Sequence, residues 1–539
     1  MFGAGGGTSS YREAEEADVI CLWGSNARET HPIFFHHVLK AVKRGARLYV
    51  IDPRRTTSAE WATGHLALHV GTDIALAHAV GRVIVERGLV NQPFVARATT
   101  GFEEWNKSVA PWTLARAEKE TGVPAALIEQ LALDYARADR SMICWTLGIT
   151  EHHTGVDNVF SLINLALATG HVGRWGSGLN PLRGQNNVQG GGDMGALPHK
   201  LPGFQDVEDA TLRGKFERLW NQSIPKKKGW NLTEMFAAMG TRELRALYVV
   251  GENPAQSEAS AEHALGRLRG LDALIVQDIF RTRTAEMADV VLPATAAWCE
   301  TEGTVTSSER RVQRVRRAVP PPGNARDDVR ILSDIARRLG HDFGEPTSED
   351  LWNELRTVSP MHAGMSYARL EANGGLQWPC PDEAHPGTTF LHARLHEEPL
   401  VGPRAPFQVV EHALPVEALD AEFPLRLTTG RRLDSFNTGV QSGGYDSPLR
   451  RGETIDLAPS DLARLGLVEG ELVRVSSRRG QVIAPARADE GLRPGTVFMT
   501  FHFPDEVDVN QLTIDASDPK SGTAEFKAAA IRIDKIAAG

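Results

Sequence analysis

Short apolar runs that end in polar turns recur through the first part of the chain. They lie at 17–23, 48–51 and 142–145. Stretches with the 3.6-residue period of an amphipathic helix accompany them, at 31–44, 74–87, 124–138 and 156–169. Short apolar runs of this kind are typical of strands that are buried on both faces, so the pattern predicts a parallel sheet covered by helices.

A second set of elements repeats this order. Apolar runs at 246–250, 273–276 and 290–293 alternate with helical stretches at 260–268, 284–288 and 329–339. In both sets the polar turn follows the strand directly, at the edge where open parallel sheets bind ligands. The turn after 17–23 carries no GxGxxG, so an ordinary dinucleotide site is not supported.

The pattern changes towards the end of the chain. A segment rich in proline, glycine and histidine at 379–407 is interpreted as a linker. Short strands separated by turn signals then predict a compact β-barrel, at 425–429, 454–457, 472–475, 481–484 and 497–500. We therefore expect an α/β protein with three domains: a first α/β domain at 1–185, a second at 186–395, and a barrel at 405–539.

Composition and charge exclude several classes of protein. The chain has 539 residues and a net charge of −9, with no basic excess for a nucleic acid. No apolar run approaches the ~20 residues of a membrane span, and the N-terminus does not have the pattern of a signal peptide. These features favour a cytoplasmic protein. The four cysteines form no CxxC pair, so no metal ligands are predicted within the chain.

The segment 180–195 carries the most specific chemistry. It holds Arg183, five carboxamides and five glycines. Glycines allow tight turns or the close approach of a ligand, and carboxamides both donate and accept hydrogen bonds. Arg183 offers a planar fork for an anion. The segment therefore suits a polar, extended ligand together with a small carboxylate.

Several polar turns have two interpretations on local evidence. Asp52 and Arg54 could hold a nucleotide or form a salt-bridged turn, and Glu252 with Asp278 could bind a guanine edge or be solvated strand ends. The segment 302–311 fits a phosphate loop or a solvated loop followed by a basic strand. His502 and Asn510 could contact a ligand or stabilise a loop. The histidine pairs at 36–37 and 152–153 favour structural roles.

Taken in order, these motifs resemble the catalytic (alpha) subunit of molybdenum- or tungsten-dependent formate dehydrogenases. These enzymes are bis-molybdopterin guanine dinucleotide oxidoreductases of the dimethyl sulfoxide reductase type. The most specific markers are 183–190 and 193–198, and the ending 512–522 is typical of NAD-linked members. Further support comes from 24–26, 51–54, 251–254, 276–279 and 429–431.

The resemblance implies two doubly wound, Rossmann-like domains and a six-stranded, double-psi type barrel that caps two pyranopterin cofactors. Arg183 would be the catalytic arginine that orients formate. Cofactor contacts are implied for Gly24, Asn26, Asp52, Arg54, Gly71, Gly148, Glu151, Gly184, Gln185, Gly251, Glu252, Asn253, Gln277, Asp278, Arg431, His502, Asn510 and Lys527.

The sequence departs from the family pattern at its start. Family members carry a cysteine or selenocysteine metal ligand and a [4Fe–4S] motif upstream of the N-terminal glycines, and neither occurs here. We therefore expect a chain truncated at its N-terminus, inactive alone, whose substrate pair is formate and carbon dioxide. Its expected partners are diaphorase-type or iron–sulfur subunits. The alternatives are another family member, such as a nitrate reductase, or a scaffold that has lost the cofactor.

Overall fold

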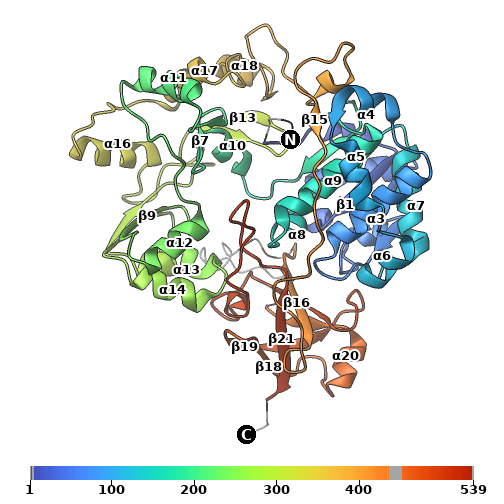
Figure 1. Cartoon of the computed structure of the whole chain (residues 1–539). Coiled ribbons are helices and arrows are strands. Elements are labelled where there is room, and N and C mark those ends of the chain that lie inside the picture. Colours follow the sequence, from blue (N-terminus) through green and yellow to red (C-terminus); the bar gives the residue numbers. More distant parts are fainter. Residues whose placement is uncertain (1, 3–4, 434, 436, 438–451, 537–539) are drawn as a thin grey trace.

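The computed structural model describes residues 2, 5–433, 435, 437 and 452–536. Its first α/β lobe is built on a five-stranded parallel sheet (Figure 1). From edge to edge the strands are β3 (Gly64–Leu66), β2 (Arg47–Ile51), β1 (Val19–Trp23), β5 (Ser141–Trp145) and β6 (Gly178–Pro181). Every residue of β1 and β5 is buried, as expected when both faces of a parallel sheet carry helices.

The two faces of this sheet pack against different helices. Ile20 and Leu22 of β1 share a core with α2 (Pro32–Lys43), whereas Cys21 and Trp23 belong to the larger core of the opposite face. The helices of that face are α3 (Asp73–Glu86), α7 (Ala125–Arg137) and α9 (Gly155–Thr169). The remaining short elements of the lobe are η1 (Arg12–Glu16), α1 (Ala27–Thr30), η2 (Ala59–Trp61), α4 (Gln92–Ala98), β4 (Thr99–Thr100), α5 (Phe102–Val109), α6 (Leu114–Thr121) and α8 (Leu147–Thr150).

The second α/β lobe has a three-stranded parallel sheet in the order β11-β10-β9. Phe236 and Leu265 form part of a core between two of its helices. The strands are β9 (Ala246–Val250), β10 (Ala273–Asp278) and β11 (Val290–Pro293). The helices are α12 (Leu232–Gly240), α13 (Pro254–Ser257), α14 (Ala261–Arg269), α15 (Arg283–Glu286) and α16 (Asp328–Arg338).

A small antiparallel layer lies above the second lobe in Figure 1. The sequence pattern did not separate it from that lobe. Its core holds Trp352 and Trp378, which are 5% and 1% exposed. The layer consists of β12 (Gly303–Thr306), β13 (Arg311–Val315) and β14 (Leu376–Gln377), with α10 (Val188–Asp193), β7 (Lys200–Leu201), β8 (Gln205–Asp206), α11 (Ala210–Trp220), α17 (Ser348–Val358) and α18 (Tyr367–Ala372) nearby.

The segment 302–311 forms β12 and the start of the basic strand β13, which pair as a hairpin. The loop between these strands packs against the N-terminal segment. The Ser308 and Tyr11 hydroxyls lie 2.7 Å apart. The guanidinium of Arg310, which is fully buried, donates to the Gly7 carbonyl at 2.7 Å. The polar groups of this hairpin therefore join two parts of the chain.

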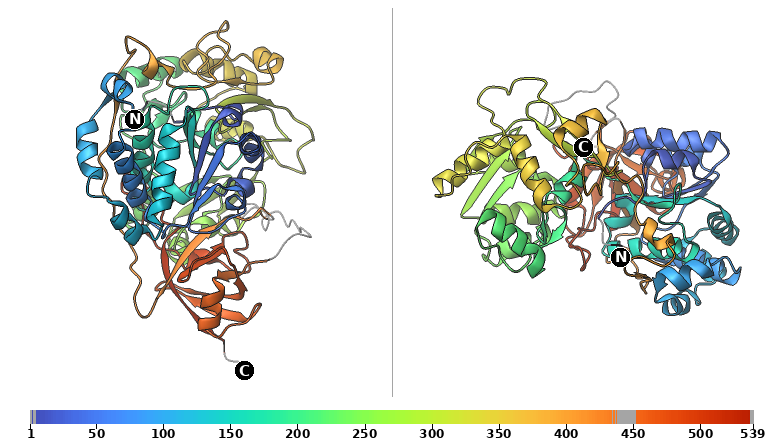
Figure 2. Two further views of the ribbon diagram at one scale, coloured as in Figure 1. Left: turned by 90° about the vertical axis from the view of Figure 1, so that its right-hand side faces the viewer. Right: turned by 90° about the horizontal axis from the view of Figure 1, so that it is seen from above.

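The C-terminal lobe is a closed six-stranded barrel at one end of the molecule (Figure 2). Its core is made of inward-facing aliphatic side chains such as Leu427, Val473 and Ile531. Around the barrel the strands are β16 (Leu425–Gly430), β20 (Thr496–Thr500), β17 (Ile455–Leu457), β19 (Gln481–Ala488), β18 (Leu472–Ser476) and β21 (Ala529–Lys535), with α20 (Pro459–Arg464) and η4 (Val509–Gln511) at its sides.

The α/β class and the six-stranded barrel are confirmed. The sequence pattern marked only five barrel strands and missed β21, which begins with two alanines. It closes the barrel by pairing with both β16 and β18. Within the described ranges, none of the helices is long and apolar enough to cross a membrane.

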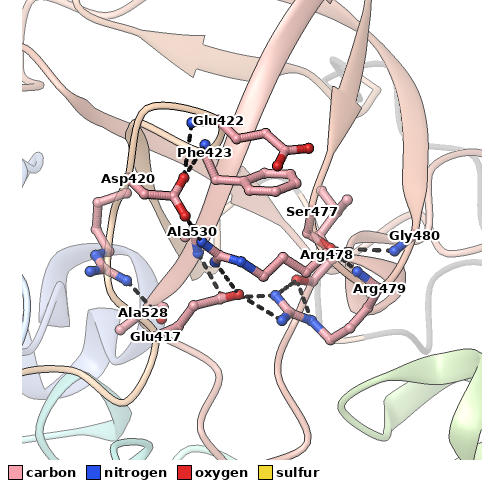
Figure 3. Close-up of polar contacts among 12 residues, drawn as sticks. Glu417, Asp420, Glu422, Phe423, Ser477, Arg478, Arg479, Gly480, Ala528 and Ala530 are labelled. Carbon is pink, nitrogen blue, oxygen red and sulfur yellow. Dashed lines mark hydrogen bonds and ion pairs between the residues drawn. The ribbon is translucent and has the colours of Figure 1, made fainter.

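The segment 393–420, which leads into the barrel, is called the strap. Its short elements are η3 (Ala393–His396) and β15 (Ala405–Pro406), and β15 pairs with β4 of the first lobe. Glu417 then anchors the strap to the barrel (Figure 3). Its carboxylate, 5% exposed, accepts hydrogen bonds from Arg478 and Arg479 at 2.8 Å and from the Ala530 amide. Burial opposes the charge of Glu417, but these donors outweigh it and hold its pKa below the ordinary value.

We predict that Glu417→Gln destabilises the strap strongly. The substitution removes the buried counter-charge that two guanidinium groups share, and loss of one partner of a buried ion pair is strongly destabilising. The control is Asp420→Asn, because Asp420 shares Arg478 but is 53% exposed, so water screens its charge and its loss should destabilise the protein much less. Urea unfolding and hydrogen exchange of segment 414–420 report the difference. Equal effects of the two variants would contradict the anchoring role.

Candidate active site

A cleft opens at the carboxyl ends of β1, β2 and β5, and the barrel closes its other side. Gly24, Asp52 and Gly148 line it from the three strand-end turns, and Arg431 and Lys527 line it from the barrel. The carboxyl ends of parallel strands share one edge of the sheet, which is why these turns meet. Eight of the residues implied by the resemblance come together here: Gly24, Asn26, Asp52, Arg54, Gly71, Gly148, Arg431 and Lys527.

Two glycines form the floor of the cleft by direct backbone contact. A Cβ on Gly148 would lie 2.6 Å from the carbonyl oxygen of Gly24, and a Cβ on Gly24 would lie 2.7 Å from the carbonyl carbon of Gly148. Gly24 also has a φ of +56°, in the region that glycine adopts without strain. Any larger residue would push the two turns apart.

Asp52 and Arg54 point into the cleft from the turn after β2. The Arg54 amide donates to an Asp52 carboxylate oxygen at 2.9 Å. Burial raises the pKa of Asp52 above its ordinary value, although Arg54, His65 and Lys527 draw it down. The Arg54 guanidinium lies 3.5 Å from the centroid of the Phe498 ring in the barrel. An acceptor beside a stacked planar cation suits a purine base or ribose.

Several positive groups reach the middle of the cleft. Arg431, Lys527 and His152 line it together with Arg54, whereas Asp73 accepts a hydrogen bond of 2.9 Å from Trp23. Lys527 is paired with Glu151 at 2.7 Å, so Glu151 reaches the cleft through this lysine. The guanidinium groups of Arg54 and Arg431 suit an anionic ligand such as a diphosphate.

The cleft continues to Arg183. A second pocket, which contains Arg183, Gly184 and Gln185, adjoins the part of the cleft that holds Asp52. The two parts share four lining residues: Thr30, Thr146, Leu147 and Arg431. One extended ligand can therefore run from Asp52 towards Arg183 without leaving the cleft.

Arg183 is held in place but keeps free donors. Its Nε donates to the Gln189 side-chain oxygen at 3.2 Å, and one terminal nitrogen donates to the Gly5 carbonyl at 3.0 Å. A guanidinium has five N–H donors, so three stay available to a ligand in the pocket. Surrounding protein desolvates the group and lowers its pKa, while Asp193 works in the opposite direction.

His31 fixes the backbone of Arg183, and the sequence pattern did not identify it. It lies just before α2, in the same pocket, and its Nε2 donates to the Arg183 carbonyl at 2.9 Å. Desolvation lowers the pKa of His31, which favours the neutral ring. The signal in the sequence was a histidine beside a helix-starting proline, next to a predicted strand-end turn.

The second lobe presents its own strand-end group away from this cleft. Gly251 and Glu252 follow β9, and Asp278 ends β10, the neighbouring strand. Burial raises the pKa of both carboxyl groups, and they also repel each other at Glu252. Gln277 is engaged by Tyr248 and Asp328. Asn253 is bonded by Thr284 and Gln256.

His502 holds loops of the barrel, and Asn510 connects the barrel to the second lobe. His502 accepts the Arg432 amide at Nε2, at 2.9 Å, and its Nδ1 lies 2.8 Å from the Asn437 carbonyl. Asn510 donates to the Gln256 carbonyl at 3.0 Å and so joins the barrel to the second lobe. Both side chains therefore have structural contacts beside any role towards a ligand.

A buried ion pair joins the barrel to the first lobe beside the cleft. His152 Nδ1 lies 3.3 Å from Glu525, and both side chains are at most 5% exposed. Burial opposes the charge on each, but their mutual attraction prevails. The pKa of Glu525 therefore falls well below its ordinary value and that of His152 rises. Nearby, Asp518 accepts the Val156 amide at the first turn of α9 at 3.0 Å.

Sequence reasoning also missed Thr56, Asp73, Thr146 and Phe498, which line the cleft. Thr146 was visible as the residue that follows a predicted strand. Phe498 gave no signal, since its contact with Arg54 depends on how the barrel docks. In the part of the chain that the structure describes, no group of three or more His, Cys, Asp or Glu side chains could hold a metal ion.

Comparisons with known proteins assign the family. Residues 4–338 match the family described as "Molybdopterin oxidoreductase", and residues 425–530 match the "Molydopterin dinucleotide binding domain". The chain is similar to the F420-dependent formate dehydrogenase 2 subunit alpha of Methanococcus maripaludis, at 41% identity over 99% of this chain and 79% of the relative. It is also similar to formate dehydrogenase H of Escherichia coli, at 36% identity over 99% and 75%.

The chain belongs to the molybdopterin oxidoreductase family and is an oxidoreductase with a domain for a molybdopterin dinucleotide. Among solved structures, acetylene hydratase from Pelobacter acetylenicus shares the fold. Its TM-score is 0.72 at 20% identity, over 98% of this chain and 79% of that chain.

The residues of the cleft fit such a cofactor. Asn26 Nδ2 and Thr56 Oγ1 are buried at its edge and have no hydrogen-bond partner among the described residues. Buried polar atoms of this kind normally find a partner. The bare glycine floor allows the close approach of a flat group, and the guanidinium groups of Arg54 and Arg431 suit a diphosphate.

We predict that Gly148→Ala lowers the cofactor content of the purified protein. The new Cβ would meet backbone rather than a side-chain tip, so the two turns must separate. The control is Gly266→Ala in α14, where nothing lies within 4 Å of the added carbon. Metal analysis by mass spectrometry, together with pterin fluorescence after acid release, measures the occupancy. Normal occupancy in Gly148→Ala would refute the role of the glycine floor.

We also predict that the contribution of the His152–Glu525 pair to stability depends on pH. The raised pKa of His152 gives stability that is complete below its ordinary value of 6.5 and is lost as the pH rises through the folded-state value. The depressed pKa of Glu525 gives stability that is present above its ordinary value of 4.5 and is lost at lower pH. The window is therefore pH 4.5 to 6.5, with Asp73 and Lys527 also facing His152.

The measurement is hydrogen exchange of residues 513–527 between pH 5 and pH 9, corrected for intrinsic exchange, in the wild type and in Glu525→Gln. The difference in protection should be largest near pH 6 and should shrink above it. A difference that stays constant up to pH 9 would contradict the charged pair.

Proposed function

We propose that this chain is the catalytic subunit of a molybdenum- or tungsten-dependent formate dehydrogenase, which oxidises formate to carbon dioxide or catalyses the reverse reaction. The observation that carries the proposal is Arg183, whose guanidinium lines the end of the cleft and is fixed there by Gln189 and the Gly5 carbonyl, which use two of its five donors among the described residues. Two relatives that match nearly the whole chain are, by name, a formate dehydrogenase alpha subunit and formate dehydrogenase H.

The proposed cofactor is a pair of molybdopterin guanine dinucleotides. Asp52 and Arg54 would hold one guanosine end, and Glu252, Gln277 and Asp278 the other. When bound, the cofactor supplies the metal centre that takes up the two electrons released by formate. Gly24, Gly148 and Gln185 would face the cofactor along the cleft, while Arg431 and Lys527 would face its anionic groups.

Arg183 would bind and orient the substrate. Formate is a small planar carboxylate, and a guanidinium can donate to both of its oxygens in parallel. Fixing the two oxygens leaves the C–H bond pointing in one direction, which is the orientation that oxidation requires.

The division of labour between the lobes follows from this assignment. We assign residues 1–185 and 186–395 to the two cofactor halves and residues 405–539 to the cap that joins them. Oxidation of formate to carbon dioxide releases two electrons and one proton. The electrons require an acceptor, and we assign this role to an iron–sulfur or diaphorase-type partner subunit.

We predict that Arg183→Lys lowers kcat/KM for formate by about a hundredfold in the holoenzyme. Lysine keeps the charge but cannot donate in a bidentate fork, and loss of one preorganised donor typically costs about 10²–10³. The assay is formate-dependent reduction of a dye. The control is Arg174→Lys, a partly buried arginine whose contacts are Gly170, His171 and Asp139, outside the cleft.

Nitrate reduction by the same preparation tests the rival family member. An enzyme that reduces nitrate but does not oxidise formate would overturn the proposal. Unchanged formate kinetics in Arg183→Lys would remove the role assigned to Arg183.

A further inference from the structure

Arg183 is aimed by a chain of hydrogen bonds that begins in the core of the antiparallel layer. Trp378 Nε1 donates to one carboxylate oxygen of Asp193 at 2.8 Å. The other oxygen of Asp193 accepts the Gln189 amide nitrogen, also at 2.8 Å. The Gln189 oxygen then accepts Arg183 Nε at 3.2 Å. Three hydrogen bonds, through the side chains of Asp193 and Gln189, therefore connect a buried tryptophan to the guanidinium in the pocket.

The hydrogen-bond partners of Gln189 permit only one orientation of its side-chain amide. Its nitrogen faces the Asp193 carboxylate and the Gly5 carbonyl, at 2.8 and 3.2 Å. Both groups accept hydrogen bonds, so the donating end of the amide must point at them. The accepting end is left for Arg183. The same Gly5 carbonyl also accepts from Arg183, so two bonds define the plane of the guanidinium.

This series of hydrogen-bonded side chains is rigid because its members are buried. Asp193 and Trp378 are each 1% exposed, and Gln189 is 3% exposed. Gln189 and Asp193 stand one turn apart on α10. A Cβ on Gly190 would lie 3.1 Å from the Thr306 hydroxyl oxygen, so the helix packs closely on β12. A group fixed through packed core side chains keeps its direction better than one carried by a loop alone.

Asp193 also supplies the nearest buried negative charge. Desolvation raises its pKa to about 6, opposed by Gln189, Trp378, Arg183 and Arg310. In turn, Asp193 raises the pKa of Arg183 and of Arg310 against their own desolvation. It therefore stabilises the charge on Arg183 without occupying the donors that face the pocket.

We propose that Trp378, Asp193 and Gln189 act as a positioning relay that sets the direction of the Arg183 fork and, through it, the affinity for formate. This inference rests on the proposed function. None of the three residues needs to touch the substrate. Their effect appears in how tightly formate binds rather than in the chemistry itself.

The test compares two buried tryptophans of the same core. Trp378→Phe removes the donor to Asp193. Trp352→Phe removes a similar buried bond, from Trp352 Nε1 to the Met365 carbonyl at 2.6 Å, that has no link to Arg183. We expect Trp378→Phe to raise KM for formate about three- to tenfold, the equivalent of one hydrogen bond, with kcat within about twofold. We expect Trp352→Phe to leave KM unchanged.

A second variant acts next to Arg183 and needs no loaded enzyme. Gln189→Met removes the acceptor of Arg183 Nε at nearly constant length. Phenylglyoxal labelling, followed by peptide mapping of Arg183, should proceed faster in Gln189→Met and Trp378→Phe than in the wild type and Trp352→Phe. Equal labelling rates together with equal KM values in all four proteins would overturn the relay.

The outcomes separate this inference from the proposed function. A wild-type holoenzyme without formate oxidation refutes the function, whatever the variants do. An active wild type whose KM rises equally in both tryptophan variants refutes the relay and leaves the function intact.

Discussion

The contact between Gly24 and Gly148 is the constraint on which the cleft depends. Two neighbouring parallel strands, β1 and β5, end in turns whose backbones touch because neither glycine has a side chain. This contact sets the floor on which Asp52, Arg54 and the barrel residues converge. It also ties the position of Arg183 to the sheet, since Thr146 and Leu147 line both parts of the cleft. Two residues without side chains, Gly24 and Gly148, therefore determine where the charged residues of the cleft lie.

The barrel connects the first and second lobes, each of which has its own parallel sheet. It reaches the first lobe through the Glu525–His152 pair and the Asp518 cap, and the second lobe through Asn510. These contacts are buried, charged or directional, so they specify one docking geometry rather than a loose apolar association. Arg431 and Lys527, which come from the barrel, enter the cleft only because that docking is fixed.

The sequence predicted the features of the fold and of the site that depend on a local pattern of residues. The strand-end turns at Gly24, Asp52 and Gly148, and the segment around Arg183, followed from apolar periodicity and from residue types that suit a ligand. It did not reveal β21, which begins with two adjacent alanines, or the antiparallel layer, which forms from segments far apart in the chain. His31, Phe498 and Trp378 were missed for the same reason, since their partners lie 152, 444 and 185 positions away.

The glycines at positions 5 to 7 illustrate a different kind of sequence restriction. Their carbonyls are gripped by Arg183, Gln189 and Arg310, and an added Cβ would lie 2.6 Å from Phe204 at Gly5, 2.9 Å from Trp378 at Gly6 and 3.1 Å from the Ser308 carbonyl at Gly7. The rest of the protein therefore contacts this segment through its backbone carbonyls, and the packing leaves no room for side chains. Variation here is limited by size rather than by chemistry, so even a change to alanine would push apart the segments that support Arg183.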